Sequence, residues 1–449
     1  MRPLLFLLIT ACANREPPEP VEGVDSASEL EDPIQPNLLI FVADDMGIDK
    51  LARYEFHPTT PSTPIIDGMM DGGVRFTRAW AQPVCSPARS SLMTGLRPVD
   101  TLIGGALGRV NSAPLADETT TMPEVLTGYS SSLIGKWHLS SQSLGGGGFR
   151  THPTDSGFGW YAGLIHGMDK EVAFDGQPQN YFSWERTENG TPTRDERYIT
   201  TANADDAIDR IEAMPEPWLL VVTFYAPHGP HQVAPAHLQT GVEKGSTDDE
   251  RKYNSAIEAM DTEMGRVIAS MEAEVAERTT VIFTTDNGTP QGVVSAPAER
   301  TKGTLFEGGI RVPMVATGYG VTRPGEDCVN LVQISDIFAT AADLAGVPAD
   351  SGTDSISFAP CLSDAAAAGR EIATAQRFKP SGPAPYSVYG ATARDDRYKL
   401  IVTSESSPAF FDLGHEPTEG EDLLSGSLNA DEQAAYDALW AVIPDELRP

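Results

Sequence analysis

Three largely apolar runs, each ending in polar residues, constrain the fold of this chain more than any other feature. They are "NLLIFVADDMG" (37–47), "PWLLVVTFYAPHGPH" (217–231) and "TTVIFTTDNGTP" (279–290). A strand that is apolar on both faces is typical of a parallel sheet buried between layers of helices. Open α/β sheets bind their ligands at the carboxyl ends of such strands. We therefore predict an α/β sheet whose strand ends carry the functional groups.

Segments between these runs alternate between helical and strand character, which supports an α/β core. Residues 254–275 carry apolar side chains at helical spacing. Residues 121–140 fit a helix followed by a strand that carries Lys136 and His138. On a strand, two residues separated by one position point to the same face. The pair would then place a cation beside a titratable imidazole, which suits an anionic ligand.

The pattern of the sequence changes near residue 365. Short strands with turns follow, and residues 429–443 fit a closing amphipathic helix capped by Asn429 or Asp431. We expect a smaller α+β subdomain here. The predicted organisation is a signal segment (1–11), a tether (12–35), a catalytic domain (36–364) and a C-terminal subdomain of antiparallel sheet and helix (365–449).

The N-terminus has the layout of an export signal. Arg2 precedes an apolar run over residues 4–9, and the residues before Cys12 are small and resemble a bacterial lipobox. The Pro- and Glu-rich segment after Cys12 reads as a solvated tether. We predict a protein exported to the periplasm or held at the outer membrane through a lipid on Cys12. An ordinary signal peptide or a wrongly assigned start is the alternative.

The net charge limits the kinds of partner that the protein can bind. The formal net charge is -32, which repels nucleic acid and anionic membranes, although a salty habitat would also explain it. The membrane would therefore be contacted only through the lipid anchor.

Of the four cysteines, Cys328 and Cys361 remain once Cys12 and Cys85 have other roles. In an oxidising compartment we predict that these two form a disulfide.

Acids and amides close two of the buried strands. Asp44 and Asp45 end the first run, and Asp286 and Asn287 end the third. Four hard oxygen ligands that meet at strand ends suit Ca²⁺ or Mg²⁺, and not zinc, which prefers cysteine and histidine. A helix cap or a turn is the alternative for either pair alone.

Further candidates lie in loops. His228 and His231 follow the second buried run, and a histidine near a metal and a lysine could act as a general acid. Lys302 is followed by glycines that allow the backbone to approach a ligand. Surface positions are the alternative for all three residues, as a solvated edge is for Lys136 and His138.

Cys85 lies in "QPVCSPARSSLMTG" (82–95). A buried, inert cysteine is one interpretation. A cysteine phosphatase is excluded, because such enzymes have an arginine six residues after the nucleophile. Here that position is Ser91, and Arg89 lies four residues after the cysteine.

The segment "CSPAR" resembles the Cys-x-Pro-x-Arg signature of the sulfatase family, in which a maturation enzyme converts the cysteine to formylglycine. The segments "ADDMG", "GKWHL", "APHGPH", "TTDNGT", "KGTLFEGGIRVP" and "FFDLGHEP" follow in the order of that family, so the resemblance covers about residues 36–425. It implies an alkaline-phosphatase-like fold, with a large mixed, mostly parallel sheet flanked by helices and a smaller C-terminal sheet. Two departures are Ala88, in a variable slot, and residues 48–56, which replace a glycine-rich, aromatic run at the rim of the pocket.

The resemblance also implies a mechanism. The hydrated aldehyde at residue 85 carries two hydroxyls: one attacks sulfur, and the other later expels sulfate by reforming the aldehyde. The implied Ca²⁺ ligands are Asp44, Asp45, the modified Cys85, Asp286 and Asn287. The implied catalytic residues are Cys85 itself, Arg89 for orientation, Lys136 and Lys302 for the sulfate oxygens, His138 as base and His228 as acid. His231 has no firm role beyond a substrate contact.

The sequence leaves alternatives open. Some relatives use formylglycine on phosphonate or phosphate esters, and a non-catalytic lipoprotein that binds sulfated glycans would share the fold. The complete set of ligands favours an enzyme that acts on a sulfate ester, either a sulfated carbohydrate or an aryl sulfate. The loops that would choose the substrate carry no clear signature.

Overall fold

The computed structural model describes residues 35–449, except 58, 111, 169–173, 242–246, 294–299, 349–351 and 415–417. The predicted signal segment, Cys12 and most of the tether lie outside the described residues. Within the described part of the chain, no helix combines the length and apolar character needed to cross a membrane.

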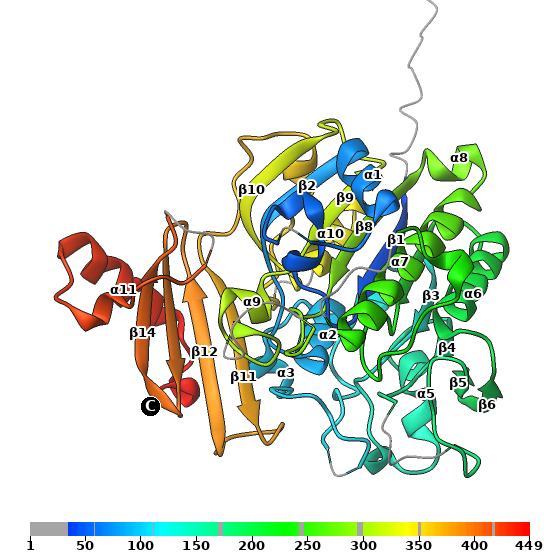
Figure 1. The fold of residues 1–449 in the computed structure, drawn as a ribbon, viewed down its shortest axis with the longest axis horizontal. Coiled ribbons are helices and arrows are strands. Elements are labelled where there is room, and N and C mark those ends of the chain that lie inside the picture. Colours follow the sequence, from blue (N-terminus) through cyan, green and yellow to red (C-terminus); the bar gives the residue numbers. More distant parts are fainter. Residues whose placement is uncertain are drawn as a thin grey trace, which may run out of the picture. The chain divides into compact units, whose positions relative to one another are not determined.

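A ten-stranded mixed sheet forms the larger part of the fold (Figure 1). Its order is β10-β2-β9-β8-β1-β7-β3-β4-β5-β6, and the five strands from β8 to β4 run parallel to one another. The strands are β1 Asn37–Ala43, β2 Gly73–Trp80, β3 Ser130–Gly135, β4 Trp160–Gly163, β5 Trp184–Glu188, β6 Thr191–Asp195, β7 Trp218–Thr223, β8 Thr279–Thr285, β9 Met314–Gly318 and β10 Glu326–Gln333. The predicted α/β class is confirmed.

The three apolar runs form β1, β7 and β8, which are neighbours at the centre of the sheet. All residues of these strands are buried, because helices cover both faces of the sheet. Leu39 and Phe41 of β1 belong to one core cluster, together with side chains of α1, α6 and α7. Leu38 and Ile40 belong to the other, with side chains of α2 and α10. This two-sided burial explains why the runs are continuous rather than alternating.

The helices are α1 Pro64–Gly72, α2 Cys85–Thr94, α3 Pro98–Thr101, α4 Met122–Val125, α5 Gly148–Asp155, α6 Ile199–Ala213, α7 Asp248–Ala269, α8 Ala273–Ala276, α9 Glu307–Ile310, α10 Asp336–Leu344 and α11 Ala430–Val442. The longest, α7, begins after Thr247, whose side chain accepts a hydrogen bond from the Glu250 amide. This helix overlaps residues 254–269 of the segment for which helical spacing is predicted, and it begins six residues earlier.

A second, antiparallel sheet of four strands follows in the order β11-β12-β13-β14. Its strands are β11 Ala373–Lys379, β12 Val388–Arg394, β13 Tyr398–Thr403 and β14 Ser406–Asp412. The closing helix α11 packs on β12 and β13. Asn429 is its cap, since its side chain accepts hydrogen bonds from the amides of Asp431 and Glu432. Of the two predicted caps, Asn429 is therefore the one used.

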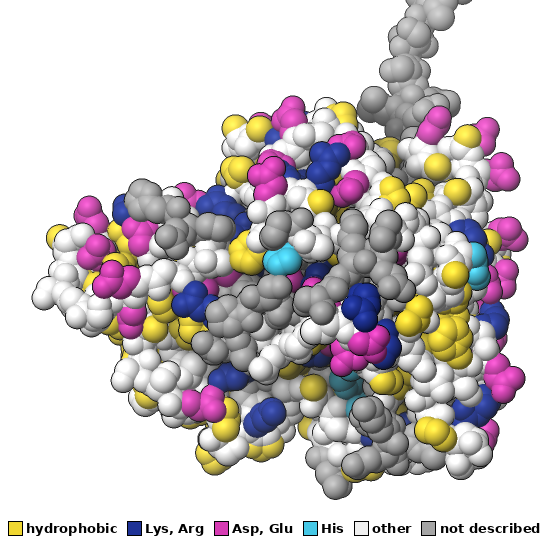
Figure 2. All heavy atoms as spheres, viewed as in Figure 1, with side chains coloured by type: hydrophobic (Ala, Val, Ile, Leu, Met, Phe, Trp, Pro, Cys, Tyr) yellow, Lys and Arg dark blue, Asp and Glu magenta, His cyan; other side chains and the backbone are white. Residues whose placement is uncertain are grey.

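The predicted disulfide is present: Cys328 of β10 is bonded to Cys361, with 6.1 Å between their Cα atoms. It ties the edge of the large sheet to the segment that leads into the small one. Figure 2 shows acidic side chains spread over the face in view, with basic ones among them. The excess of negative charge is therefore not gathered into a single patch on that face.

Candidate active site

The carboxyl ends of the central strands bring the predicted residues together. Asp44 and Asp45 follow β1, Lys136 follows β3, and Asp286 follows β8. The Asp45 amide donates a hydrogen bond to Asp286 Oδ1 at 3.1 Å, so the acidic ends of β1 and β8 are in direct contact. The loop after β7 delivers His228, whose Nε2 lies 3.6 Å from Asp45 Oδ2. Parallel neighbours end at the same edge of the sheet, which explains this convergence.

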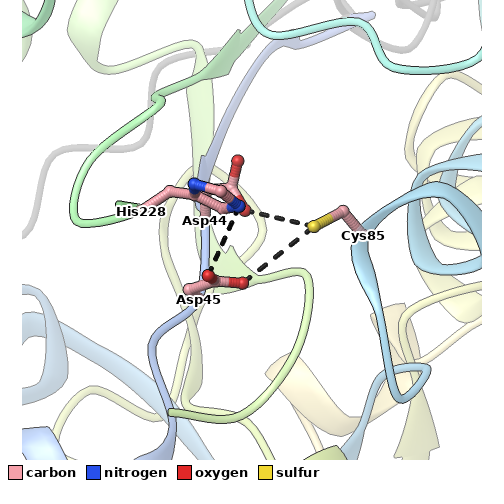
Figure 3. Close-up of side chains that lie close together, drawn as sticks. All are labelled: Asp44, Asp45, Cys85 and His228. Atoms are coloured by element: carbon pink, nitrogen blue, oxygen red, sulfur yellow. Dashed lines mark hydrogen bonds and ion pairs between the residues drawn. The ribbon is translucent and has the colours of Figure 1, made fainter. Parts of the chain in front are cut away.

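Cys85 is the first residue of α2, a helix whose ten residues are all buried. Its Sγ lies 3.4 Å from Asp44 Oδ1 and 4.0 Å from Asp45 Oδ1. Figure 3 shows the thiol facing the two carboxylates across the strand ends. Lys302 Nζ lies 3.6 Å from the sulfur on another side. Burial, followed by the Asp44 charge, raises the pKa of the thiol, so the unmodified cysteine is neutral and a poor nucleophile.

Two buried cations, Lys136 and Arg89, and the partly buried Lys302 neutralise the carboxylates. Lys136 Nζ lies 2.6 Å from Asp44 Oδ2, and Lys302 pairs with Asp45. Arg89 Nε donates to Asp286 Oδ2 at 3.0 Å. A fully buried arginine requires this kind of compensation, because an unpaired buried charge is very costly.

The surrounding charges also shift the pKa values of the buried carboxylic acids. Burial alone would raise the pKa of Asp44, but Lys136 and its neighbouring cations lower it well below 3.8. For Asp286, burial and the Asp44 charge outweigh Arg89 and raise the pKa to about 7. Three carboxylates crowded into one buried site therefore need more positive charge than Arg89 and the two lysines provide.

Oxygen donors suited to a hard cation fill the same space. Ligand atoms of Asp44, Asp45, Cys85 and His228 all lie within 4.8 Å of one another. Asn287 Nδ2 donates to Asp45 Oδ1 at 2.8 Å, whereas Asn287 Oδ1 is buried and has no hydrogen-bond partner among the described residues. An orphaned amide oxygen beside buried carboxylates fits a Ca²⁺ or Mg²⁺ site.

The helix and strand predicted over residues 121–140 are present as α4 and β3, but the prediction that the strand carries Lys136 and His138 is wrong. β3 ends at Gly135, which has φ +97° and whose added Cβ would lie 2.0 Å from the Thr223 carbonyl oxygen. The chain turns there, and His138 itself has φ +60°. The two side chains therefore do not share a strand face. Lys136 reaches Asp44, while His138 Nε2 donates to the Leu107 carbonyl at 3.1 Å.

The surroundings of His138 and His228, the two candidate proton carriers, favour the neutral form of each ring. Burial, followed by the charge of Lys136, lowers the pKa of His138 well below 6.5. Burial also lowers that of His228, against the opposing effect of Asp45. Among the described residues, the His138 ring is hydrogen-bonded to Leu107 and packs against His166, and no hydrogen bond joins it to Cys85. His231 packs its ring against Tyr253 at 5.5 Å.

Several residues around the site carry no sequence signal of their role. The Tyr253 hydroxyl donates to the Asp45 carbonyl at 2.5 Å, although α7 reads only as an amphipathic helix. The Tyr225 ring lies 5.5 Å from Lys136 Nζ. Thr289 Oγ1 accepts from the Gly47 amide at 2.9 Å and donates to Asp49 Oδ1 at 2.6 Å. Thr289 thereby ties the start of the unusual 48–56 segment to the loop that follows Asn287.

The sequence matches the Sulfatase family over residues 36–347, and the chain therefore belongs to the sulfatase family.

Human N-acetylgalactosamine-6-sulfatase is 30% identical over 361 residues, which cover 74% of this chain and 66% of that enzyme, just under two thirds of its length. Human arylsulfatase A is 27% identical over 454 residues, covering 88% of this chain and 84% of the relative. The crystal structure of Ps i-CgsB in complex with k-i-k-neocarrahexaose superposes with a TM-score of 0.74 at 22% identity, covering 91% of this chain and 92% of that one. At that identity, the structural likeness bears on the fold alone.

Proposed function

We propose that this protein hydrolyses a sulfate ester, using formylglycine derived from Cys85 and a bound Ca²⁺. The observation that carries the proposal is the convergence of Lys136, Lys302 and Arg89 with three carboxylates around residue 85. The three cations and three carboxylates sum to zero charge. A divalent cation among them would leave a net positive site that can hold a sulfate group.

The oxygen atoms of the strand ends would hold the metal. The proposed ligands are Asp44, Asp45, the modified residue 85, Asp286 and Asn287. When bound, Ca²⁺ and the hydrated aldehyde together supply a hydroxyl of lowered pKa for attack on sulfur. Arg89 would fix the positions of two of these carboxylates, because its guanidinium pairs with Asp286 and also lies 3.4 Å from Asp44.

The remaining side chains act on the substrate. Lys136 and Lys302 approach residue 85 from different elements, so they can hold the sulfate oxygens as charge develops. His138 is neutral and can take a proton from the attacking hydroxyl once its ring turns toward residue 85. His228 stands at the more exposed side of the site, with its side chain 26% exposed, and can protonate the leaving alcohol when its ring carries a proton, a form that the Asp45 carboxylate favours.

We infer that the substrate is a sulfated carbohydrate or an aryl sulfate. Relatives named for N-acetylgalactosamine 6-sulfate and for aryl sulfates support this class. The N-terminal layout supports export with a lipid on Cys12, and the "CSPAR" segment supports a formylglycine-generating enzyme as maturation partner.

A comparison of four substrates tests the function. Protein produced with a formylglycine-generating enzyme should release sulfate from 4-nitrophenyl sulfate or from N-acetylgalactosamine 6-sulfate, and Cys85→Ala should not. Faster turnover of an aryl phosphate diester or phosphonate monoester than of any sulfate ester would instead establish a phosphorus ester hydrolase. No turnover of either class by the matured protein would contradict an enzymatic role.

A further inference from the structure

A second group of cations lies beside the proposed active site. Arg109 Nη2 lies 3.1 Å from Glu185 Oε2, and Arg150 Nη2 lies 2.7 Å from Glu185 Oε1. Both guanidinium groups also lie over the Phe149 ring, at 5.1 Å and 5.8 Å. Among the described residues, these two arginines share the single carboxylate of Glu185. The group therefore keeps a net positive charge in a chain whose overall charge is -32.

Polar atoms in this group lack hydrogen-bond partners. Arg109 Nε and Gln179 Nε2 are buried without a partner among the described residues, and Gln179 is only 5% exposed. The His166 ring is 4% exposed, and neither of its nitrogens completes a hydrogen bond, although the Leu107 and Gly108 carbonyls lie close to it. Buried polar groups normally have hydrogen-bond partners, and leaving one unsatisfied destabilises the folded protein. Several such atoms in one place mark a binding site better than a structural core.

The group borders the catalytic residues. The His166 ring packs edge-on against His138 with 4.5 Å between ring centroids. The Leu107 carbonyl accepts from His138 Nε2, and Arg109 lies two residues further along the same segment. The Gln179 side chain accepts from the Glu185 amide at 2.8 Å, which joins it to the arginine pair. A ligand on Arg109 and His166 would thus be adjacent to the group bound at His138.

We infer that Arg109, Arg150, His166 and Gln179 form a second anion subsite, which binds a carboxylate or a second sulfate on the same saccharide as the scissile sulfate. Arginine forks match carboxylate and sulfate oxygens, and an amide and an imidazole add donors in a partly dry setting. This inference rests on the proposed function and makes its substrate more specific: a saccharide with at least two anionic groups, rather than a simple aryl sulfate.

Paired substrates test the subsite. The first pair is N-acetylgalactosamine 6-sulfate alone and attached to glucuronate; the second is N-acetylglucosamine 6-sulfate and glucosamine 2-N,6-O-disulfate. For each pair, the ratio of kcat/KM for the dianionic to the monoanionic member is measured. Arg109→Ala should lower this ratio by about tenfold or more, the loss expected for a charged hydrogen bond. The first pair reports a carboxylate subsite and the second a sulfate subsite.

Arg186→Ala is the matched control, because Arg186 is as buried as Arg109 and also pairs with acids, Asp206 and Glu188. It should leave both ratios unchanged. Ratios that are the same in Arg109→Ala and in wild type would overturn the subsite, and Arg150→Ala decides by the same criterion if Arg109→Ala does not fold. Should the wild type turn over no sulfated sugar, the proposed function fails, and binding of glucuronate against glucose, measured by NMR titration, decides the subsite alone. Equal binding of the two sugars would then overturn it.

Discussion

Each charge around residue 85 has a partner of opposite sign on a different element. Asp44 from β1 meets Lys136 from the end of β3, and Asp286 from the end of β8 meets Arg89 of α2. No single element could form the site, so the chain must fold before these groups meet. Burial, together with the neighbouring Asp44 charge, raises the pKa of Asp286 and so disfavours its ionised form.

Removing calcium is expected to affect both activity and stability. A chelator should abolish sulfate release and lower the melting temperature, because the crowded carboxylates lose their compensating charge. Added Ca²⁺ should restore both. Asn287→Leu removes the orphaned oxygen at nearly constant volume and should raise the Ca²⁺ concentration needed for half-maximal activity by about tenfold or more. Unchanged activity in excess chelator, after dialysis, would contradict a metal site.

His152 supports the segment that carries Lys136 and His138. Its Nδ1 accepts from Trp137 Nε1 at 2.9 Å, and its Nε2 donates to the Leu115 carbonyl at 3.1 Å. The bond from Trp137 needs an unprotonated Nδ1 and hence the neutral ring, and burial lowers the pKa of His152 below 6.5. The folded protein therefore binds this proton less tightly than the unfolded chain does. The stabilisation is fully present above pH 6.5 and is lost as the pH falls below it.

His152→Gln tests this linkage. The difference in unfolding free energy between wild type and variant should shrink as the pH is lowered from above to below the ordinary histidine pKa of about 6.5. Denaturant unfolding at several pH values measures it. His237→Gln, at an exposed position, is the control for the substitution. A difference that is constant with pH, or that grows as the pH falls, would contradict the assignment of a neutral ring.

At the scale of elements, α9 and the C-terminal sheet are joined by buried charges. Lys399 of β13 is fully buried, with Nζ 3.0 Å from Glu307 Oε1 and 2.6 Å from Glu419 Oε1. Glu307 begins α9, five residues after Lys302. The ion pairs therefore anchor the loop that presents Lys302 to residue 85, which gives the small sheet a part in the geometry of the active site.

Lys399→Met should destabilise the protein by about 3–5 kcal/mol, because it leaves two buried carboxylates without their shared cation. Denaturant unfolding measures the loss. Lys252→Met is the control, since the ion pairs of Lys252 in the described part of the chain are with the exposed Asp248 and Asp249, and its loss should change the unfolding free energy little. Equal effects of the two substitutions would show that the buried group contributes nothing beyond a surface pair.

The central strands could be predicted from the sequence, because a strand that is buried on both faces appears as a continuous apolar run. The positions of Asp44, Asp286 and Asn287 follow from where those runs end. The position of His138 could not be predicted, since it depends on the φ of Gly135 and on close contact with Thr223 from another strand. Contacts made across 76 residues, as between Arg109 and Glu185, leave no local pattern at all.

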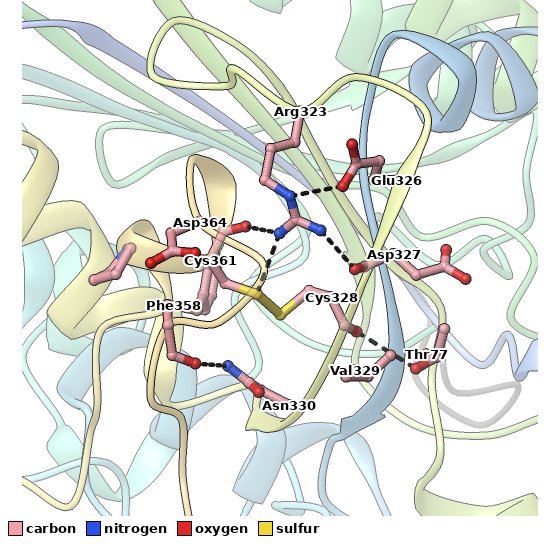
Figure 4. Close-up of a disulfide and its surroundings, with 12 residues drawn as sticks. Thr77, Arg323, Glu326, Asp327, Cys328, Val329, Asn330, Phe358, Cys361 and Asp364 are labelled. Carbon is pink, nitrogen blue, oxygen red and sulfur yellow. Dashed lines mark hydrogen bonds and ion pairs between the residues drawn. A yellow bond between two sulfur atoms is a disulfide. The ribbon is translucent and has the colours of Figure 1, made fainter.

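At the scale of the whole molecule, a disulfide joins β10, at the edge of the large sheet, to the segment that leads into the small sheet. Figure 4 shows Cys328 and Cys361 with the Arg323 guanidinium, which donates to the Cys361 carbonyl at 2.7 Å and to the Asp327 carbonyl at 3.0 Å. The bond closes a loop with a sequence separation of 33. Both cysteines are buried, so the bridge is protected from reductants in the folded protein.

Replacing both cysteines by serine should lower the unfolding free energy by about 3–4 kcal/mol on the chain-entropy account. The double variant avoids a free thiol, and its unfolding is compared with that of oxidised wild type. Reduced wild type, unfolded in the presence of a reductant, should lose a similar amount. A double variant as stable as the oxidised protein would contradict a stabilising role for the bridge.

The central claim is that residue 85 receives the sulfuryl group. Cys85→Ser measures this most directly, because it keeps one hydroxyl among the same cations but cannot regenerate an aldehyde. Incubated with a ³⁵S-labelled aryl sulfate, the variant should retain label on the peptide that spans residues 82–95, with at most one turnover, while Cys85→Ala should retain none. Continuous sulfate release by Cys85→Ala at the rate of the matured wild type would contradict the account.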